Sequence, residues 1–315
     1  MKTQFAKDVH YGLSQEQKQL SSKYFYDKTG DELFMQIMSM PEYYLTRAEL
    51  EIFSEQTDKM INSFGIQKDQ FFELIELGAG DGTKTKKLLE VLDKRNYQFD
   101  YLPIDISANV LEHLGQMLAQ ELPNVSVKTQ QGDYFETLKE LRDSHNPKVV
   151  LFLGSNIGNL FDHQAAKFIY ALGANLSAGD KLLIGVDRVK PEAVVLPAYN
   201  DKTGITRAFN LNLLERINNE LGGDFNIAQF EHAPEYDEQE GIARSFLRSK
   251  VDQTVTIFDI DQSYAFKQGE LIHMEISRKY TTEIMQNIIA DTDFVITDVL
   301  TDNKNYFSDF ILERR

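Results

Sequence analysis

Three glycines, Gly78, Gly80 and Gly82, mark the segment of this chain whose residue types and spacing are best suited to binding a ligand. They follow an apolar stretch at residues 72–77 and precede a helical pattern at residues 86–92. Glycine adopts positive φ and carries no Cβ, so a turn built from it brings backbone N–H groups up to a ligand. A strand, a glycine turn and a helix N-terminus in this order are typical of sites for nucleotide-like ligands. The turn alone leaves open which of these ligands is bound.

The glycine spacing and two acidic residues indicate which nucleotide-like ligand is bound. Dinucleotide folds favour G-x-G-x-x-G, whereas this chain has G-x-G-x-G preceded by Glu76, a variant suited to S-adenosylmethionine (SAM). Asp105 is placed to accept hydrogen bonds from both ribose hydroxyls, and Asp133 from the adenine amine while Tyr134 packs nearby. Aspartates at strand ends often only cap the next helix, so each acid alone is weak support. Together, behind the glycine turn, they predict a SAM-type nucleoside site.

A second set of polar residues lies in the late segment 271–277. Strand alternation puts His273, Glu275 and Ser277 on one face, and apolar residues on the other. Hydrogen-bonding side chains two residues apart on an otherwise apolar strand can hold a planar nitrogenous group. The same pattern also suits the exposed polar face of an edge strand, and the residues alone do not decide between the two.

Alternating strands and helices must position these residues. The expected strands are residues 72–77, 99–104, 125–130, 148–153 and 181–186. Such alternation is typical of an α/β fold with a doubly wound parallel sheet, in which strand ends line the ligand crevice. The pattern resumes late with a helix at 281–289 and strands at 294–300 and 306–313. A terminal antiparallel hairpin is the usual ending of class I SAM-methyltransferase sheets and not of dinucleotide dehydrogenases.

The other segments do not show this alternation of strands and helices. Residues 1–20 are expected to form a loose arm or a short helix, and Thr29 with Glu32 reads as a capping box that opens a helix through about residue 38. Between residues 190 and 270 a helical stretch at 200–221 and mixed strand-like segments suggest an inserted cap with its own core. Four tyrosines, at 24, 26, 43 and 44, lie close together in the sequence. Their rings could also simply pack in an amphipathic core while their hydroxyls contact water.

Composition excludes several classes of function. The 315 residues carry a formal net charge of −16, which repels phosphate backbones and disfavours nucleic acid as a partner. The chain has no cysteine, and its six histidines never fall at i, i+3 or i, i+4 spacing, so thiolate chemistry is excluded and a metal site is disfavoured. No apolar run reaches the roughly 18 residues of a membrane span, and the first residues lack a signal-peptide core. We expect a cytoplasmic monomer acting on a small molecule.

Several motifs together resemble the ergothioneine-pathway L-histidine Nα-methyltransferases, and the likeness runs from about residue 20 to the C-terminus. They are the tyrosine-rich segments 24–34 and 41–49, the Gly-Ser-x-Ile-Gly-Asn-Leu loop at 154–160, Tyr-Asn-Asp at 199–201 with Phe-Asn-x-Asn at 209–212, and Glu-Ile-Ser at 275–277. Members of that family use three SAM molecules to convert histidine into its Nα-trimethylated betaine, hercynine. The resemblance implies a SAM-binding domain at residues 60–190 and 280–315. It also implies a smaller α+β substrate domain at residues 13–59 and 191–279.

The resemblance also implies roles for individual residues. Asn159 and Tyr199 would hold the substrate carboxylate, and Tyr26 and Gly154 would lie near the reacting amine. Of these, Tyr26, Gly154 and Asn159 are the predicted catalytic residues. Phe34 and Tyr43 would line the pocket, and Glu275 and Ser277 would bind the imidazole. Ser245 is the remaining predicted substrate residue. The predicted SAM contacts are Gly78, Gly80, Lys84, Asp105, Asp133 and Tyr134.

One residue departs from the family pattern. Family members usually carry Met-Trp before Leu-Arg, and this chain has Ser245-Phe246 there. Because the methionine helps to shape the imidazole pocket, Ser245 keeps open a second hypothesis, a SAM-dependent N-methyltransferase of another amino acid or small amine. A non-catalytic SAM-binding module and a nicotinamide-dependent oxidoreductase are further alternatives. The retained pocket residues disfavour the first of these, and the glycine spacing and terminal hairpin disfavour the second.

Overall fold

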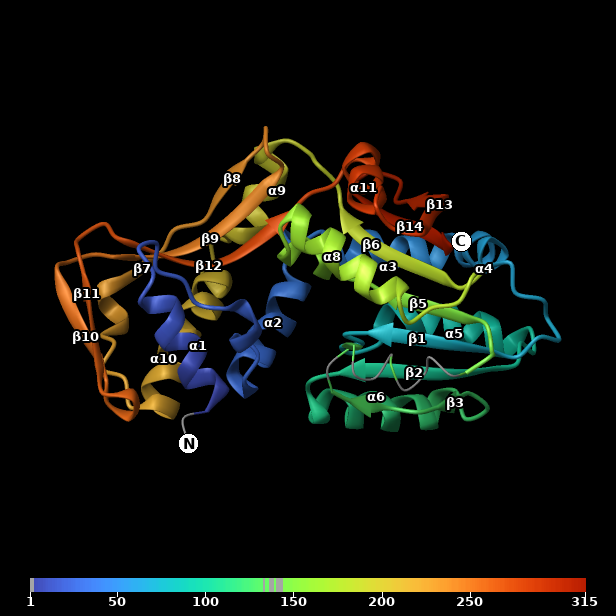
Figure 1. The fold of residues 1–315 in the computed structure, drawn as a ribbon, viewed down its shortest axis with the longest axis horizontal. Coiled ribbons are helices and arrows are strands. Elements are labelled where there is room, and N and C mark those ends of the chain that lie inside the picture. The colour runs from blue at the N-terminus through green and yellow to red at the C-terminus, as the bar shows by residue number, and fades with distance from the viewer. Residues whose placement is uncertain (1–2, 133, 136–138, 140–143) are drawn as a thin grey trace. The chain divides into compact units, whose positions relative to one another are not determined.

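A computed structural model describes residues 3–132, 134–135, 139 and 144–315 of the chain (Figure 1). The chain forms two compact units, each assembled from two segments. Unit 1 comprises Met1–Tyr44 and Lys190–Ser277, and unit 2 comprises Leu45–Val189 and Arg278–Arg315. Residues 45–59, which we assigned above to the substrate domain, belong here to unit 2.

Unit 2 is built on one eight-stranded sheet with the order β13-β14-β6-β5-β1-β2-β3, and β4 also pairs with β2. The strands are β1 (Phe72–Leu77), β2 (Phe99–Asp105), β3 (Ser126–Val127), β4 (Gln130–Gln131), β5 (Lys148–Phe152), β6 (Lys181–Asp187), β13 (Phe294–Thr301) and β14 (Phe307–Arg314). Strands β1 to β6 pair in parallel, whereas β14 pairs antiparallel with both β6 and β13. The predicted doubly wound sheet with a terminal hairpin is confirmed.

The central strands are apolar runs because helices cover both faces of a parallel sheet. Every residue of β1, β5 and β6 is buried. The helices of unit 2 are α3 (Leu45–Glu55), α4 (Thr57–Phe64), α5 (Thr83–Lys94), α6 (Ala108–Glu121), α8 (Asp162–Gly173) and α11 (Thr282–Ile289), with a 3₁₀ turn η2 (Asn156–Asn159). The strand expected at 125–130 is instead two separate two-residue strands, β3 and β4. That segment is polar and half-exposed, so little burial favours a longer strand.

Unit 1 combines a small antiparallel sheet with helices, as expected for a smaller α+β region. Its four-stranded sheet has the order β12-β9-β7 with β8 on β9, and β10 and β11 form a separate hairpin. The strands are β7 (Phe230–His232), β8 (Glu235–Asp237), β9 (Ile242–Ser249), β10 (Gln253–Ile257), β11 (Gln262–Phe266) and β12 (Leu271–Arg278). The helices are α1 (Gln4–Leu13), α2 (Lys28–Ser39), α9 (Glu192–Tyr199) and α10 (Ile205–Leu221), with 3₁₀ turns η1 (Ser22–Tyr24), η3 (Ile227–Gln229) and η4 (Phe258–Ile260).

Three local expectations for unit 1 change. The N-terminus is a helix, α1, that buries Phe5, Val9 and Leu13 in the core of this unit, so it is not a loose arm. The capping box at Thr29 is wrong: Asp27 is the N-cap of α2, and its carboxylate accepts a 2.7 Å hydrogen bond from the N–H of Gly30. The helix expected at 200–221 begins only at Ile205, after the separate helix α9.

Candidate functional site

The glycine turn lies between β1 and α5, as predicted. Gly78, Gly80 and Gly82 have φ values of 72°, 55° and 67°, a region that side chains other than glycine rarely adopt. A Cβ on Gly78 would lie 2.8 Å from the hydroxyl of Tyr134, and one on Gly82 would collide with Leu114. A Cβ on Gly80 would meet no heavy atom within 4 Å. The turn is therefore closely packed at both ends and open at its middle glycine.

Asp105 ties the glycine turn to the next strand. One of its carboxylate oxygens accepts a 3.2 Å hydrogen bond from the N–H of Gly80, and the other a 2.9 Å bond from the N–H of Ser107. Because each oxygen has a second lone pair, the carboxylate keeps acceptor capacity for a ligand. Gly78, Gly80, Asp105 and the Tyr134 hydroxyl thus gather at the C-terminal ends of β1 and β2, where ligands bind in open α/β sheets. The predicted contact Asp133 lies outside the described residues.

Lys84, in the first turn of α5, is joined to the predicted catalytic loop through Glu49 of α3. Lys84 and the fully buried Glu49 form an ion pair. The N–H of Gly154 donates to both carboxylate oxygens of Glu49, at 3.0 Å each. A Cβ on Gly154 would lie 3.6 Å from Nζ of Lys84. Glu49 was part of a motif in the sequence but had no assigned role there.

Glu76, the acid before the glycine turn, is buried and hydrogen-bonded. It accepts from the hydroxyl of Tyr101 and, at 2.8 Å, from that of Thr85. Burial raises the pKa of the Glu76 carboxyl to about 7, because the loss of hydration outweighs the two hydrogen bonds that lower it. Burial, and then the neighbouring Glu76, also raise the pKa of Tyr101.

The loop after β5 packs against other residues of unit 2. Gly154 and Ser155 have φ values of 72° and 60°, and the Ser155 hydroxyl accepts a 3.0 Å hydrogen bond from the N–H of Asp187. A Cβ on Gly158 would lie 2.9 Å from the carbonyl oxygen of Arg278. The predicted residue Asn159 ends the 3₁₀ turn η2 and is exposed. This packing explains the small residues of the Gly-Ser-x-Ile-Gly-Asn motif.

Asn156, in the same loop, was not singled out in the sequence. An added Cβ on Gly78 would lie 3.4 Å from its Nδ2, and one on Gly154 would lie 3.8 Å from its Oδ1. Asn156 therefore lies beside both the glycine turn and the predicted catalytic glycine. Its exposed amide, next to two glycines of positive φ, is a donor and acceptor that a ligand at the ends of β1 and β5 can meet.

In unit 1, the predicted residues of the N-terminal segment form an aromatic cluster. The Tyr26 ring lies 5.5 Å from the Phe34 ring and 5.8 Å from the Phe209 ring, both nearly edge to face. Tyr43 packs against the same core, partly buried. Tyr26 is 36% exposed, so part of its ring remains open to a ligand. The aromatic faces are suited to stabilising a cation.

The predicted residues on β12 and α9 also meet. The Tyr199 hydroxyl donates a 2.8 Å hydrogen bond to the hydroxyl of Ser277. The ring of His232 is hydrogen-bonded at 2.9 Å to the carbonyl oxygen of Tyr199, which anchors the end of α9. Burial alternates along β12, with His273 and Glu275 half-buried between fully buried apolar residues. The expected alternation along the strand is therefore confirmed, and β12 lies at the end of the order of its sheet.

Ser245 lies on β9, the strand next to β12. It is buried, as are Ala243 and Leu247, which share its face of the strand, and Leu247 belongs to the core of unit 1. Phe246 points to the other face, where its ring lies 5.4 Å from the ring of His273. Ser245 and Phe246 thus lie on opposite faces of the strand next to β12.

A family model described as histidine-specific methyltransferase, SAM-dependent, matches residues 5–314. The chain belongs to this family. The histidine N-alpha-methyltransferase of Mycolicibacterium smegmatis (strain ATCC 700084 / mc(2)155) is 35% identical over 285 residues, which cover 90% of this chain and 86% of the relative. That of Mycobacterium tuberculosis (strain CDC 1551 / Oshkosh) is 36% identical over 274 residues, covering 87% and 84%. The predicted family and the predicted enzyme class, a SAM-dependent methyltransferase, are confirmed.

A solved structure supports the fold of this histidine-specific methyltransferase. The mitomycin 7-O-methyltransferase MmcR matches with a TM-score of 0.51 and 9% identity, over 99% of this chain and 69% of that chain. At this identity the likeness concerns the fold alone.

The chemistry of unit 2 fits the methyl donor of the family. The open middle glycine of the turn leaves room for a ligand against the backbone, and Asp105 retains lone pairs for hydroxyl donors. Lys84 has three N–H donors for anionic groups, of which the ion pair with Glu49 uses one. Among the described residues, no group of three histidine, aspartate or glutamate side chains is arranged to hold a metal ion. In the same part of the chain no helix is long and apolar enough to cross a membrane.

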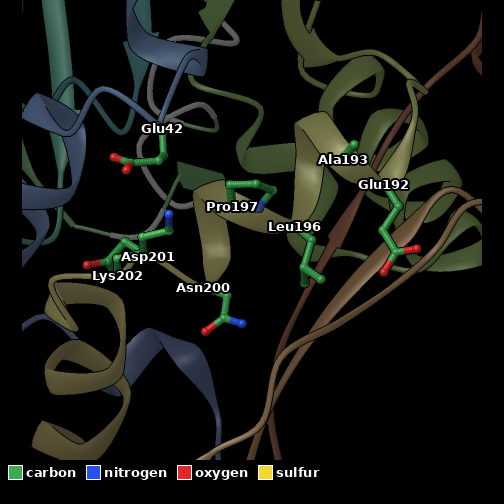
Figure 2. A pocket seen from close by; sticks show the side chains of 8 residues that line it. All are labelled: Glu42, Glu192, Ala193, Leu196, Pro197, Asn200, Asp201 and Lys202. Carbon is green, nitrogen blue, oxygen red and sulfur yellow. The ribbon is translucent and has the colours of Figure 1, made fainter.

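A cavity of about 610 Å³ lies beside α9 in unit 1 (Figure 2). It is lined by Glu42, Glu192, Ala193, Leu196, Pro197, Asn200, Asp201 and Lys202. None of the predicted substrate residues lines it, although Tyr43 and Tyr199 are sequence neighbours of Glu42 and Asn200. Asp201 is engaged by the N-terminus of α10, since its carboxylate accepts from the N–H groups of Ile205 and Thr206. Desolvation raises the pKa of Asp201, but the hydrogen bond from the Thr203 hydroxyl and these two backbone bonds outweigh it and lower the pKa.

Proposed function

We propose that this enzyme transfers methyl groups from SAM to the α-amine of L-histidine, three times in succession, to form hercynine. The observation that carries the proposal is the match to the histidine-specific family over nearly the whole chain, residues 5–314. The relatives at 35–36% identity are named histidine N-alpha-methyltransferases, and the chain covers most of their length. Every substrate residue that the motifs predict is present except the methionine replaced by Ser245.

The proposal assigns the methyl donor to unit 2. SAM, when bound, supplies a methyl group on a sulfonium: the amine nitrogen can bond to this methyl carbon in line as the S–C bond breaks and the thioether S-adenosylhomocysteine leaves, without a base acting on the methyl. The glycine turn and Lys84 would hold the amino-acid end of the donor, and Asp105 its ribose. The contacts of Asp105 with Gly80 and Ser107 support this role, because they orient the carboxylate towards the turn.

Unit 1 would bind histidine. Tyr199 would hold the carboxylate, and Glu275 and Ser277 would bind the imidazole. The hydrogen bond from Tyr199 to Ser277 supports this assignment, because it fixes the hydroxyls of two predicted substrate residues next to each other. A carboxylate such as that of Glu275 suits the ring N–H of an imidazole.

The α-amine must be neutral to attack, although it is mostly protonated in water at neutral pH. The site must therefore favour the neutral amine or pass a proton to water. Alignment of the two bound reactants can supply roughly 7–11 kcal/mol of the barrier reduction. The aromatic faces of Tyr26 and Tyr43 would stabilise the cation that forms, by about 0.5–2 kcal/mol.

The experiment is an amino-acid panel with SAM, analysed by mass spectrometry. We expect L-histidine to yield products with one, two and three added methyl groups, and other amino acids to yield none. Turnover of another amino acid without turnover of histidine would refute the substrate assignment and leave the reaction class intact.

The two-site division has its own test in Glu275→Ala. This variant should lose histidine affinity while SAM affinity, measured by calorimetry, stays nearly unchanged. Glu16→Ala, which removes the same group from an exposed position of unit 1, is the matched control and should behave as the wild type. A loss of SAM affinity in Glu275→Ala would show that the division is wrong.

A second candidate function is N-methylation of another amino acid or small amine. Ser245 favours it, because a small buried hydroxyl replaces a long flexible side chain beside β12. Ser245→Met distinguishes the two: if histidine is the substrate, the variant should keep or improve histidine turnover. If the site has changed its substrate, the variant should gain histidine turnover that the wild type lacks.

A further inference from the structure

Beneath the loop after β5, two carboxyl groups converge on one glycine. Gly185 of β6 lies opposite Asp309 of β14 in the antiparallel pairing. A Cβ on Gly185 would collide with the carboxylate of Glu49 and would lie 3.0 Å from Oδ1 of Asp309. Glu49 and Asp309 are both fully buried. The missing side chain at Gly185 therefore provides the space into which Glu49 reaches from α3.

The two carboxyl groups differ in their partners. Glu49 forms an ion pair with Lys84 and accepts the N–H of Gly154 on both oxygens. Neither oxygen of Asp309 has a hydrogen-bond partner among the described residues. An ionised carboxylate in that position would be buried, unpaired and beside a second carboxylate, which is strongly unfavourable. Asp309 is therefore a neutral acid in the folded protein.

The charges around the pair agree with this assignment. Burial, and then the neighbouring Glu49, raise the pKa of Asp309 well above its usual range, and Lys84 only partly opposes them. Glu76 of β1 also faces this group, and burial raises its pKa to about 7. Tyr101 of β2 stays protonated. Lys84 thus faces three acids, and among the described residues Glu49 is the one that forms a direct ion pair with it.

We propose that Glu49 is a positioning residue for methyl transfer. Its negative charge, with a neutral Asp309 beside it, holds the Gly154 amide and the Lys84 ammonium in the arrangement that receives the methyl donor. The inference rests on the proposed function in one respect, the placing of Gly154 and Lys84 at the reacting groups. Among the described residues Lys84 donates one N–H to Glu49, which leaves two N–H groups for a ligand. Gly154 is held at the start of a loop that ends at Asn159, so a shift at its amide moves the loop.

The test compares Glu49→Gln with Asp309→Asn. Glutamine keeps the shape of Glu49 but removes its charge and turns one acceptor into a donor. We expect it to weaken SAM binding about tenfold or more, since hydrogen bonds to charged groups are the strong ones, and to lower kcat as well. Asparagine replaces a neutral acid with a neutral amide, so Asp309→Asn should retain SAM affinity and kcat within about threefold at neutral pH, the ordinary spread of such changes.

Two further variants distinguish a folding defect from the loss of the positioning role of Glu49. Glu90→Gln removes a carboxylate that pairs with lysines on the exposed side of α5 and should match the wild type. Should Glu49→Gln fail to fold by circular dichroism, Glu49→Asp replaces it. This variant keeps the charge but is one methylene shorter, so it should lower kcat through the lost contact with Gly154 and affect SAM affinity less than the glutamine variant would.

SAM affinity and kcat of Glu49→Gln equal to those of the wild type would overturn the positioning role, as would an unimpaired Glu49→Asp where that variant is used. An Asp309→Asn variant as impaired as Glu49→Gln would overturn the neutral state of Asp309. SAM affinity is measured by calorimetry without histidine, so a wild type that binds SAM but does not methylate histidine would refute the proposed function alone.

Discussion

The buried carboxyl of Glu76 makes the stability of the protein depend on pH in a calculable way. Its pKa is about 7 in the folded state, against an ordinary value of 4.5, because burial disfavours the charged form. The folded state therefore holds this proton more tightly than the unfolded chain does. The resulting stabilisation is fully present below pH 4.5 and is lost as the pH rises through about 7.

The size of the effect follows from the shift. At about 1.4 kcal/mol per pKa unit, the difference between about 7 and 4.5 corresponds to about 3 kcal/mol of unfolding free energy. Glu76→Gln removes the titration, since glutamine is neutral throughout, and keeps an acceptor for one of the two hydroxyl donors. Tyr101 can reverse its hydroxyl and accept from the new amide.

The assay is urea-induced unfolding of the wild type and Glu76→Gln at a series of pH values from 4.5 to 8. All other groups titrate in both proteins, so the difference between the two curves isolates Glu76. We expect the wild type to lose about 3 kcal/mol relative to the variant across this range. Parallel curves, or a wild type that gains stability relative to the variant as the pH rises, would show that the buried Glu76 carboxyl does not have a raised pKa.

Three further substitutions follow from local geometry. Gly30→Ala places a Cβ into the carbonyl oxygen of Phe25 and should lower the unfolding free energy by about 3 kcal/mol in urea denaturation. Gly115→Ala, inside α6 with its nearest neighbour 3.7 Å away, should raise it by about 0.5–1 kcal/mol, and a loss there would contradict the packing. Tyr199→Phe removes the hydroxyl that binds Ser277 and should raise the KM for histidine about tenfold at unchanged SAM affinity. An unchanged KM would exclude Tyr199 from the substrate site.

Much of unit 2 could be predicted from the sequence because its signals are local. Strands buried on both faces must be apolar, so β1, β5 and β6 are visible as short apolar runs. The glycine turn is visible because positive φ demands glycine at fixed spacing. The length of the strand expected at 125–130 is overestimated, because a polar edge segment has no burial pattern that defines where a strand begins and ends.

The parts that were missed depend on contacts between distant segments. Glu49 is 105 residues from Gly154, and its importance follows only from the approach of α3 to Gly185 and Asp309. A glutamate in an amphipathic helix is ordinarily exposed, so nothing local marks it as buried. The cap of α2 was misplaced for a similar reason: Asp27 is fixed partly by Asn212 of α10, whose side chain donates to it at 2.8 Å.

The nitrogen that receives the methyl groups can be identified by NMR of the labelled product. The enzyme is incubated with L-histidine and SAM carrying a ¹³C-labelled methyl group, and the product is examined by NMR. We predict a single labelled signal from three equivalent methyl groups on the α-nitrogen. Label on an imidazole nitrogen, or no label on histidine while another amine in the mixture is methylated, would contradict the claim.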